Sequence, residues 1–317
     1  MKKLLALLLC GVMLLAFAAC GDKPETPDAP DAVDTEDTPP AAKEFEVTTA
    51  TSGNFEITVL GAEAVTTRDD TAGIRIYYEF TNNATYTVKG VDDVPVTATQ
   101  NGETLNSVFA NEMIDIDTTK ELFVRPGATI RCTTVRELLD DKAPVTFTVG
   151  DFAADADVEV EFDLANLPGA PAEEFAATPI TEGLQVEGLA TEGTFDEKYA
   201  VKILGAEKIE KSNGDVCVLV HYSYTNNSDA DKEFFTAVAT KVFQDGIQLE
   251  STAPADATSQ NYKNRFEKVA PGATIEADLC FKLASDSPVE IEVSDKHITN
   301  ATDDYFEERI GMVFTVA

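Results

Sequence analysis

Residues Ile74–Asn83 read IRIYYEFTNN, and residues Val218–Asn227 read VLVHYSYTNN. In both runs, aliphatic and aromatic residues recur at every second position, and both runs end in Thr-Asn-Asn. A period of two in β-branched and aromatic residues predicts a β-strand with one face buried. Asparagine suits the turn that follows, because it tolerates left-handed backbone and bonds to nearby backbone groups. The sequence therefore predicts the same strand in two places, 144 residues apart.

Further segments repeat in the same order and at nearly the same spacing. One residue is inserted before one of them and one is deleted after it. A period this long indicates a duplicated domain rather than a solenoid of short repeats. The matched pairs are Val59–Glu63 with Ile203–Glu207, Gln100–Gly102 with Gln244–Gly246, Pro126–Ile130 with Pro271–Ile275, and Val145–Val149 with Val289–Val293.

Each copy is predicted to be all-β. Asn101-Gly102 and Asp245-Gly246 are strong hairpin signals between alternating runs. The last strands are expected at Val158–Leu164 and Ile310–Val316. A count of about seven strands in about 110 residues favours an immunoglobulin-like sandwich. A small closed barrel is the alternative.

The chain divides into five parts by composition. The segment after Cys20 is rich in Pro, Asp, Thr and Ala and has almost no large apolar residue before Phe45, so it should be a disordered stalk. Segments 106–124 and 250–269 are less regular and are expected to hold a long loop or a short helix. The expected parts are a signal peptide at 1–19, the acidic stalk at 20–50, the first sandwich at 51–165, a linker with one extra strand at 166–195, and the second sandwich at 196–317.

The N-terminus carries an export signal. Lys2 and Lys3 precede the apolar run Leu4–Phe17, which is short for a membrane span and typical of a signal peptide. The run ends in FAAC, which resembles the lipobox of bacterial lipoproteins and implies that Cys20 is acylated. Two or more acyl chains attach a protein stably to a membrane. We therefore expect a lipid anchor on Cys20 and an extracytoplasmic, cell-surface location; an ordinary secretory signal is the alternative.

The formal net charge is −33. A surface of this sign repels phosphate backbones, which argues against nucleic acid as a partner. It also argues against electrostatic binding to anionic lipid, so attachment to the membrane should be through a covalently linked lipid. Acidic pairs are frequent, but none fits a calcium-binding loop, and they are expected to be solvated turns.

The second copy resembles a known family. Its segments Ile203–Glu207, Tyr222–Ser228 and Phe243–Glu250 look like domain of unknown function 5067, and the first copy is a looser match, with Ala84 in place of Ser228 and Thr99 in place of Phe243. The family occurs on lipoproteins and surface proteins of Gram-positive bacteria. The resemblance implies an immunoglobulin-like fold and a surface location, and it assigns no site residues.

Catalytic and metal-binding motifs are absent from the sequence. The two histidines, His221 and His297, have no second histidine or cysteine at ligand spacing. No nucleophile motif accompanies them. We expect both to be surface residues, with no catalytic site, no metal and no cofactor.

Three cysteines lie beyond the signal peptide region. Alternation places Cys132 inward, and it places Cys217 and Cys280 on the outward faces of their strands. If those two strands are adjacent, Cys217 and Cys280 could form a cross-strand disulfide in an exposed compartment.

The preferred function is a non-enzymatic binding or adhesion module for an extracellular protein, peptide or glycan. Two linked copies can raise avidity without new contacts. Tyr77, Tyr86 and Tyr262 could stack on sugars, although the chain has no Trp. The alternative is a structural or envelope-stress component of the cell wall. An enzyme or an accessory subunit of a transporter is less favoured.

Overall fold

A computed structural model describes residues 45–89, 96–114, 117, 119–150, 158–172, 175–180, 184–295 and 309–316. The signal peptide, Cys20, the stalk as far as residue 44, and His297 lie outside these residues. Residues Lys43–Ala317 belong to one compact unit.

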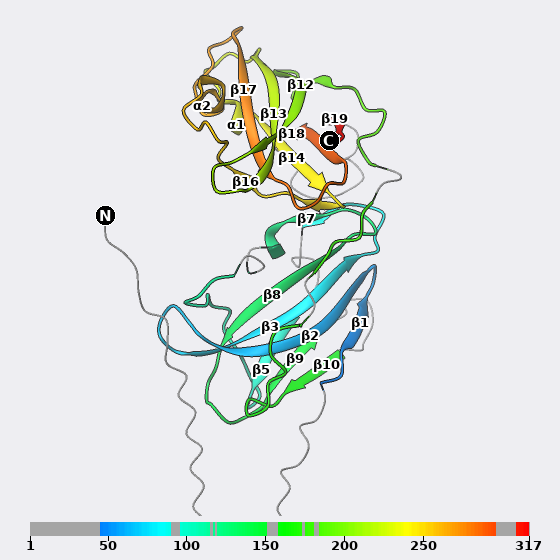
Figure 1. Ribbon diagram of the computed structural model, residues 1–317, viewed down its shortest axis with the longest axis vertical. Helices are drawn as coiled ribbons and strands as arrows, with labels where there is room; N and C mark the ends of the chain where they lie inside the picture. Colours follow the sequence, from blue (N-terminus) through cyan, green and yellow to red (C-terminus); the bar gives the residue numbers. More distant parts are fainter. Residues whose placement is uncertain are drawn as a thin grey trace, which may run out of the picture. The chain divides into compact units, whose positions relative to one another are not determined.

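The first copy is a two-layer antiparallel sandwich (Figure 1). One sheet has the strand order β1-β2-β3-β8 and the other has the order β10-β9-β5-β6. The bounds are β1 Thr48–Ser52, β2 Phe55–Thr66, β3 Ala72–Asn82, β4 Val88–Lys89, β5 Val96–Gln100, β6 Glu103–Thr104, the 3-10 helix η3 Thr119–Glu121, β7 Phe123–Val124, β8 Thr129–Glu137, β9 Val145–Val149 and β10 Val158–Phe162.

The second copy repeats this arrangement. One sheet has the order β11-β12-β13-β17-β16, and the other has the order β19-β18-β14-β15-β7-β4, so its last two strands come from the first copy. The bounds are β11 Glu192–Phe195, β12 Tyr199–Glu210, β13 Val216–Asn226, α1 Phe234–Ala237, β14 Val238–Gln244, β15 Ile247–Gln248, β16 Ser251–Thr252, α2 Gln260–Asn264, β17 Thr274–Lys282, β18 Val289–Asp295 and β19 Arg309–Phe314.

The repeat extends to backbone irregularities. In the first copy the pairing of β2 with β3 shifts between Val59 and Gly61. In the second copy the pairing of β12 with β13 shifts between Ile203 and Gly205, which are 144 residues further on. One extra residue in one strand is a β-bulge, which bends the strand locally. The prediction of two all-β sandwiches is confirmed, and the closed-barrel alternative is wrong because every sheet formed by the described strands is open.

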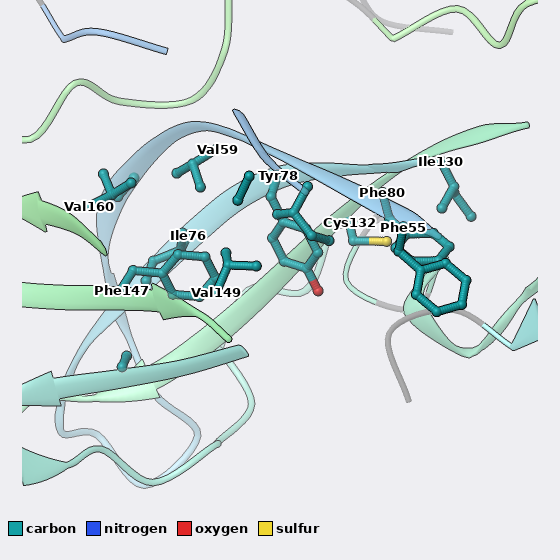
Figure 2. Close-up of a cluster of buried hydrophobic side chains, with 14 of the residues drawn as sticks. Phe55, Val59, Ile76, Tyr78, Phe80, Ile130, Cys132, Phe147, Val149 and Val160 are labelled. Carbon is teal, nitrogen blue, oxygen red and sulfur yellow. The ribbon is translucent and has the colours of Figure 1, made fainter. Parts of the chain in front are cut away.

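Each copy has its own hydrophobic core. The alternating residues of β3 meet aromatic and aliphatic side chains from the opposite sheet, and Figure 2 shows Tyr78 at the centre of this cluster. The ring of Tyr78 lies 6.1 Å from that of Phe147, centroid to centroid. Cys132 is buried in the same core, as the alternation predicted. In the core of the second copy, Tyr222 occupies the position of Tyr78, and Tyr224 occupies that of Phe80.

The two copies begin earlier than the sequence predicted. Strand β1 begins at Thr48, inside the segment expected to be stalk, and Phe45 stacks on Phe162 with ring centroids 5.7 Å apart. Strand β11 is the extra strand expected in the linker, and it pairs with β12 of the second copy. The irregular segments hold η3 and the short helix α2.

Strand β3 is buried on both faces, so the expectation of one buried face is wrong. Arg75 and Tyr77 point away from the core but are almost fully covered. Arg75 donates to Glu63, Asp117 and the Glu112 carbonyl, and Tyr77 donates to Glu63. The loop that carries Asp117 folds over this face, and a sequence pattern local to β3 does not show that loop.

Candidate ligand pocket between the two copies

The two copies share backbone hydrogen bonding. Strand β7 of the first copy pairs with β15 of the second at Val124 and Ile247. The backbone N–H of Arg125 donates to the carbonyl of Gly246 at 2.7 Å. The edge of one sandwich is therefore continuous with a sheet of the other.

Buried charge accompanies this pairing. Arg125 is only 2% exposed, and its guanidinium lies 3.8 Å from the centre of the Phe243 ring. Its Nη2 is 3.0 Å from Glu292 Oε2, and its Nε is 3.5 Å from Glu290 Oε1. Arg309 also donates to Glu292 at 3.0 Å. Charges removed from water need such partners, because an unpaired buried charge is strongly destabilising.

A glycine lets the second copy approach the first. Gly246 has φ +75°, and a Cβ there would lie 2.6 Å from Ala128 Cβ and 2.7 Å from Ile180 Cδ1. At Gly102, the equivalent turn in the first copy, φ is +80° and nothing lies within 4 Å of such a Cβ. The same hairpin turn is thus open in the first copy and packed against its neighbour in the second.

Beside this contact lies a pocket of about 530 Å³. Ligand pockets commonly measure roughly 300–1,000 Å³ and are mostly apolar with a few polar groups. This one has that character, and the first copy, the linker and the second copy all contribute to it. The lining residues are Thr119, Leu122, Ile130 and Arg131, then Phe175, Ala176 and Ala177, then Gln244, Asp245, Ile247, Gln248, Leu249, Glu250, Lys282, Leu283, Ala284 and Ser285.

The basic lining residues already face carboxylates. Arg131 pairs with Glu79 at 2.8 Å and lies over the ring of Phe175 at 5.3 Å. Lys282 lies 3.9 Å from Asp215.

Asp245 differs from these two residues. It is 5% exposed, and its Oδ2 accepts a hydrogen bond from Ser285 Oγ at 2.6 Å. Its Oδ1 is buried and has no hydrogen-bond partner among the described residues.

The residues singled out from the sequence lie elsewhere. His221 is on the outer face of β13, about one-third exposed, with Nδ1 2.8 Å from Asp278 Oδ1 and Nε2 3.7 Å from Glu207 Oε1. It does not line the pocket. In the described part of the chain, no group of three His, Cys, Asp or Glu side chains is arranged to hold a metal ion. No helix there is long and apolar enough to cross a membrane.

Cys217 and Cys280 lie on adjacent strands, β13 and β17, on the face away from the core. They are diagonal rather than opposite, since Cys217 faces Lys282 and Cys280 faces Leu219. They lie on the face that the alternation predicted to point outward, but both side chains are buried. A disulfide between them stays a prediction. Burial, followed by the proximity of Cys217, raises the pKa of Cys280 to about 12.

Sequence reasoning missed the pocket and the contact beside it. The signal was present as a departure from the repeat, because the residues of the contact differ in type from the residues at the equivalent positions of the other copy. Arg125 corresponds to Ala270, while Lys241, Phe243, Glu290 and Glu292 correspond to Thr97, Thr99, Thr146 and Thr148.

Comparison with known proteins gives a family. No curated protein matches the chain. One solved structure, described as a candidate lipoprotein of Staphylococcus aureus subsp. aureus NCTC 8325, is 15% identical, covers 38% of this chain and 96% of its own, and has a TM-score of 0.30. The model of a domain of unknown function, DUF5067, matches residues 31–151 and 189–295, so both copies are included. The predicted family is confirmed, and this chain belongs to the DUF5067 family.

Proposed function

We propose that this protein is a lipid-anchored, extracytoplasmic binding protein without enzymatic activity, and that its ligand occupies the pocket between the two copies. The observation that carries the proposal is the composition of the pocket. It is concave, mainly apolar and built jointly by both sandwiches and the linker. Ligand sites occur preferentially at such junctions between domains.

The location follows from the N-terminal sequence. A basic start, an apolar run of signal-peptide length and Cys20 after two alanines support acylation of Cys20. Labelled palmitate should enter the wild-type protein in its bacterial host, and Cys20→Ala should abolish incorporation. Incorporation that persists in this variant would contradict the anchor.

A binding role is favoured over catalysis by the chemistry of the pocket. The described residues that line it include no histidine or cysteine, and its two basic residues already pair with carboxylates outside the pocket lining. General acid–base or nucleophilic catalysis requires an activated group within reach of the reacting atom. The lining offers surfaces for packing and a few polar groups for orientation.

Filling the pocket tests the binding role. Ala284 lines the pocket, so Ala284→Phe should occupy part of its volume, whereas Ala270→Phe places the same ring at an exposed site outside it. Both variants are made on a chain that begins at Gly21, which lacks the signal peptide and the cysteine expected to be acylated. We expect capture of cell-wall or host material by the parent and by Ala270→Phe, and at least tenfold weaker capture by Ala284→Phe. Equal capture by all three would exclude the pocket, and no capture by any would favour the structural role in the cell wall.

A further inference from the structure

The strand edge by which the first copy pairs with the second copy recurs in the second copy itself. In the first copy, the carbonyl of Val124 on β7 accepts a hydrogen bond from Asn82 Nδ2 at 2.9 Å. In the second copy, the carbonyl of Val269 accepts one from Asn226 Nδ2 at 2.7 Å. The two asparagines end equivalent strands, so residues 268–270 are the counterpart of the edge that pairs with β15.

The outer side of this second edge is open. Val269 exchanges both of its backbone hydrogen bonds with Lys232, so the neighbouring N–H groups of Lys268 and Ala270 point to the other side. Neither N–H has an acceptor among the residues that the structure describes. In the first copy, the N–H of Arg125, which corresponds to Ala270, donates to a carbonyl of the turn before β15. A strand edge with unpaired groups is able to accept one further strand.

Two exposed phenylalanines lie at the end of this edge. Phe235 and Phe266 are 49% and 52% exposed, and their ring centroids are 5.1 Å apart in an edge-to-face arrangement. Helices α1 and α2 lie side by side in Figure 1, and the N–H of Phe235 in α1 donates to the carbonyl of Arg265 at the end of α2. The guanidinium of Arg265 lies 4.3 Å from the centre of the Phe266 ring. Exposed apolar side chains that cluster in this way mark interaction surfaces.

Basic side chains flank the same edge, although the net charge of the chain is −33. Glu233 and Glu267 lie in the same two segments, but no ion pair joins either of them to these basic groups within the described ranges. A partner that carried carboxylates would compensate these positive charges. The basic residues are Lys232, Lys263, Arg265 and Lys268.

We infer that the edge formed by residues 268–270 binds an extended, acidic segment of a partner protein, which adds one strand to the second copy. Segments that add to a sheet edge gain affinity from main-chain hydrogen bonds and specificity from alternate side chains. The residue opposite Val269 should be apolar, because Ile247 is opposite Val124 in the first copy. Acidic residues on either side of it would face the basic groups. This surface is separate from the pocket, since none of its residues lines the pocket.

A second copy of this chain fits the edge less well than such a partner. Its exposed counterpart of β15 is β6, where Glu103 stands at the position of Ile247. Pairing would place the Glu103 carboxylate opposite Val269, which is 3% exposed and belongs to the core of the second copy. Burial of an unpaired carboxylate is costly, and the large net charges of two such chains repel each other.

A defined peptide tests the inference. The probe is the blocked, fluorescein-labelled hexapeptide Asp-Gly-Ile-Gln-Leu-Glu, which has the sequence of residues 245–250, contains β15 and is acidic at both ends. Its affinity for the chain that begins at Gly21 is measured by fluorescence anisotropy. The comparison peptide is Lys-Gly-Ile-Gln-Leu-Lys with the same label. We expect saturable binding of the acidic peptide and at least tenfold weaker binding of the basic one.

Two variants locate the binding at the edge. Ala270→Pro removes one outward N–H, and Lys268→Glu reverses one exposed charge without changing the backbone. Affinity for the acidic peptide should fall at least tenfold in Ala270→Pro and at least fivefold in Lys268→Glu. Lys142→Glu is the matched control, because it makes the same charge change at an exposed residue of the first copy and should leave the affinity within about twofold.

The inference is overturned if the acidic peptide does not bind at millimolar concentration, or if both peptides bind equally. Unchanged affinity in Lys268→Glu, when that variant unfolds in urea as the wild type does, would place the peptide elsewhere and reject the edge. Sedimentation velocity without peptide provides a further check. A dimer that forms with increasing concentration and is lost in Lys268→Glu would make a second copy the occupant and reject the partner proposed. None of these variants changes the pocket, so the capture test with Ala284→Phe reports on the proposed function independently.

Discussion

Arg125 of the first copy and Glu292 of the second form an ion pair at 3.0 Å in which both side chains are almost completely buried. The residues are 167 positions apart, and they join two sandwiches that each have a separate hydrophobic core. Burying a pair of charges is costly in itself, so its presence at this junction fixes one arrangement more than it adds stability.

Removing the cation should therefore destabilise the junction. Arg125→Met keeps an unbranched apolar chain but removes the guanidinium, so it leaves Glu290 and Glu292 with less compensation, and we expect the free energy of unfolding to fall by about 3–5 kcal/mol. Urea unfolding followed by circular dichroism measures it, and we expect one transition in the wild type and two in the variant. Lys89→Ala is the control, because it removes the exposed pair with Glu121 and should cost about 0–1 kcal/mol. A loss below 1 kcal/mol in Arg125→Met would contradict the structural role of the pair.

The two hairpin glycines should respond differently to alanine. Both have positive φ, so Gly102→Ala and Gly246→Ala each incur about 1–2 kcal/mol of backbone strain. At Gly246 the new methyl group also overlaps Ala128 and Ile180, which should add about 1–3 kcal/mol. Thermal unfolding of the two variants measures the difference. Equal melting temperatures would mean that the Gly246 turn does not pack against the first copy.

Thiol labelling probes the outer face of the second copy. The thiolate is the reactive form of cysteine, and the raised pKa of Cys280 suppresses it. With iodoacetamide at pH 8, we expect native labelling of Cys217 and Cys280 to be at least tenfold slower than labelling in urea. Intact mass provides the control, since the predicted disulfide would lower it by two hydrogens and prevent labelling in urea until reductant is added. Rapid native labelling would contradict the burial of both thiols.

Much of the fold could be predicted from the sequence because it depends on local periodicity. The alternation in Ile74–Asn83 and Val218–Asn227 places Tyr78 and Tyr222 in the cores, and the turn signals at Gly102 and Gly246 mark true hairpins. These features depend on neighbours a few residues away, so the pattern of side chains is sufficient.

The pocket could not be predicted in the same way. Asp245 and Asn101 have the same turn signature, and only the position of the first copy makes one buried and the other exposed. The cover over Arg75 likewise comes from Asp117, 42 residues further along the chain. Contacts of this kind are set by how sheets and loops pack, which periodicity does not encode. The available indication of the contact was a residue-by-residue comparison of the two copies. Arg125 of the first copy stands at the position that Ala270 occupies in the second.

The buried lysine at the junction makes stability depend on pH. Burial lowers the pKa of Lys241 from 10.5 to about 8, against a favourable interaction with Glu292. Between these two pH values the unfolded chain binds a proton that the folded chain has released, so the free energy of unfolding rises with pH. Below pH 8 both states are protonated and the cost of burying the charge is present in full. Raised pKa values act in the opposite direction: that of Cys280, about 12, lowers the free energy of unfolding once unfolded cysteine ionises near pH 9, and that of Tyr77, about 12, does so above pH 10, where unfolded tyrosine ionises.

The parent for this test carries Cys280→Ala, which removes the opposing thiol. We therefore expect its free energy of unfolding to increase by about 2 kcal/mol between pH 7 and pH 9.5, as measured by urea titration at constant ionic strength. Adding Lys241→Met removes the titrating lysine and retains an apolar chain over the ring of Phe123, which the lysine ammonium approaches to 4.2 Å. The profile of this variant should be flat over the same range. Lys202→Met is the control, because Lys202 is half exposed and paired at the surface with Glu192, and its profile should rise as that of the parent does. A flat parent profile would show that Lys241 stays solvated, and that the two copies do not bury it as the structure indicates.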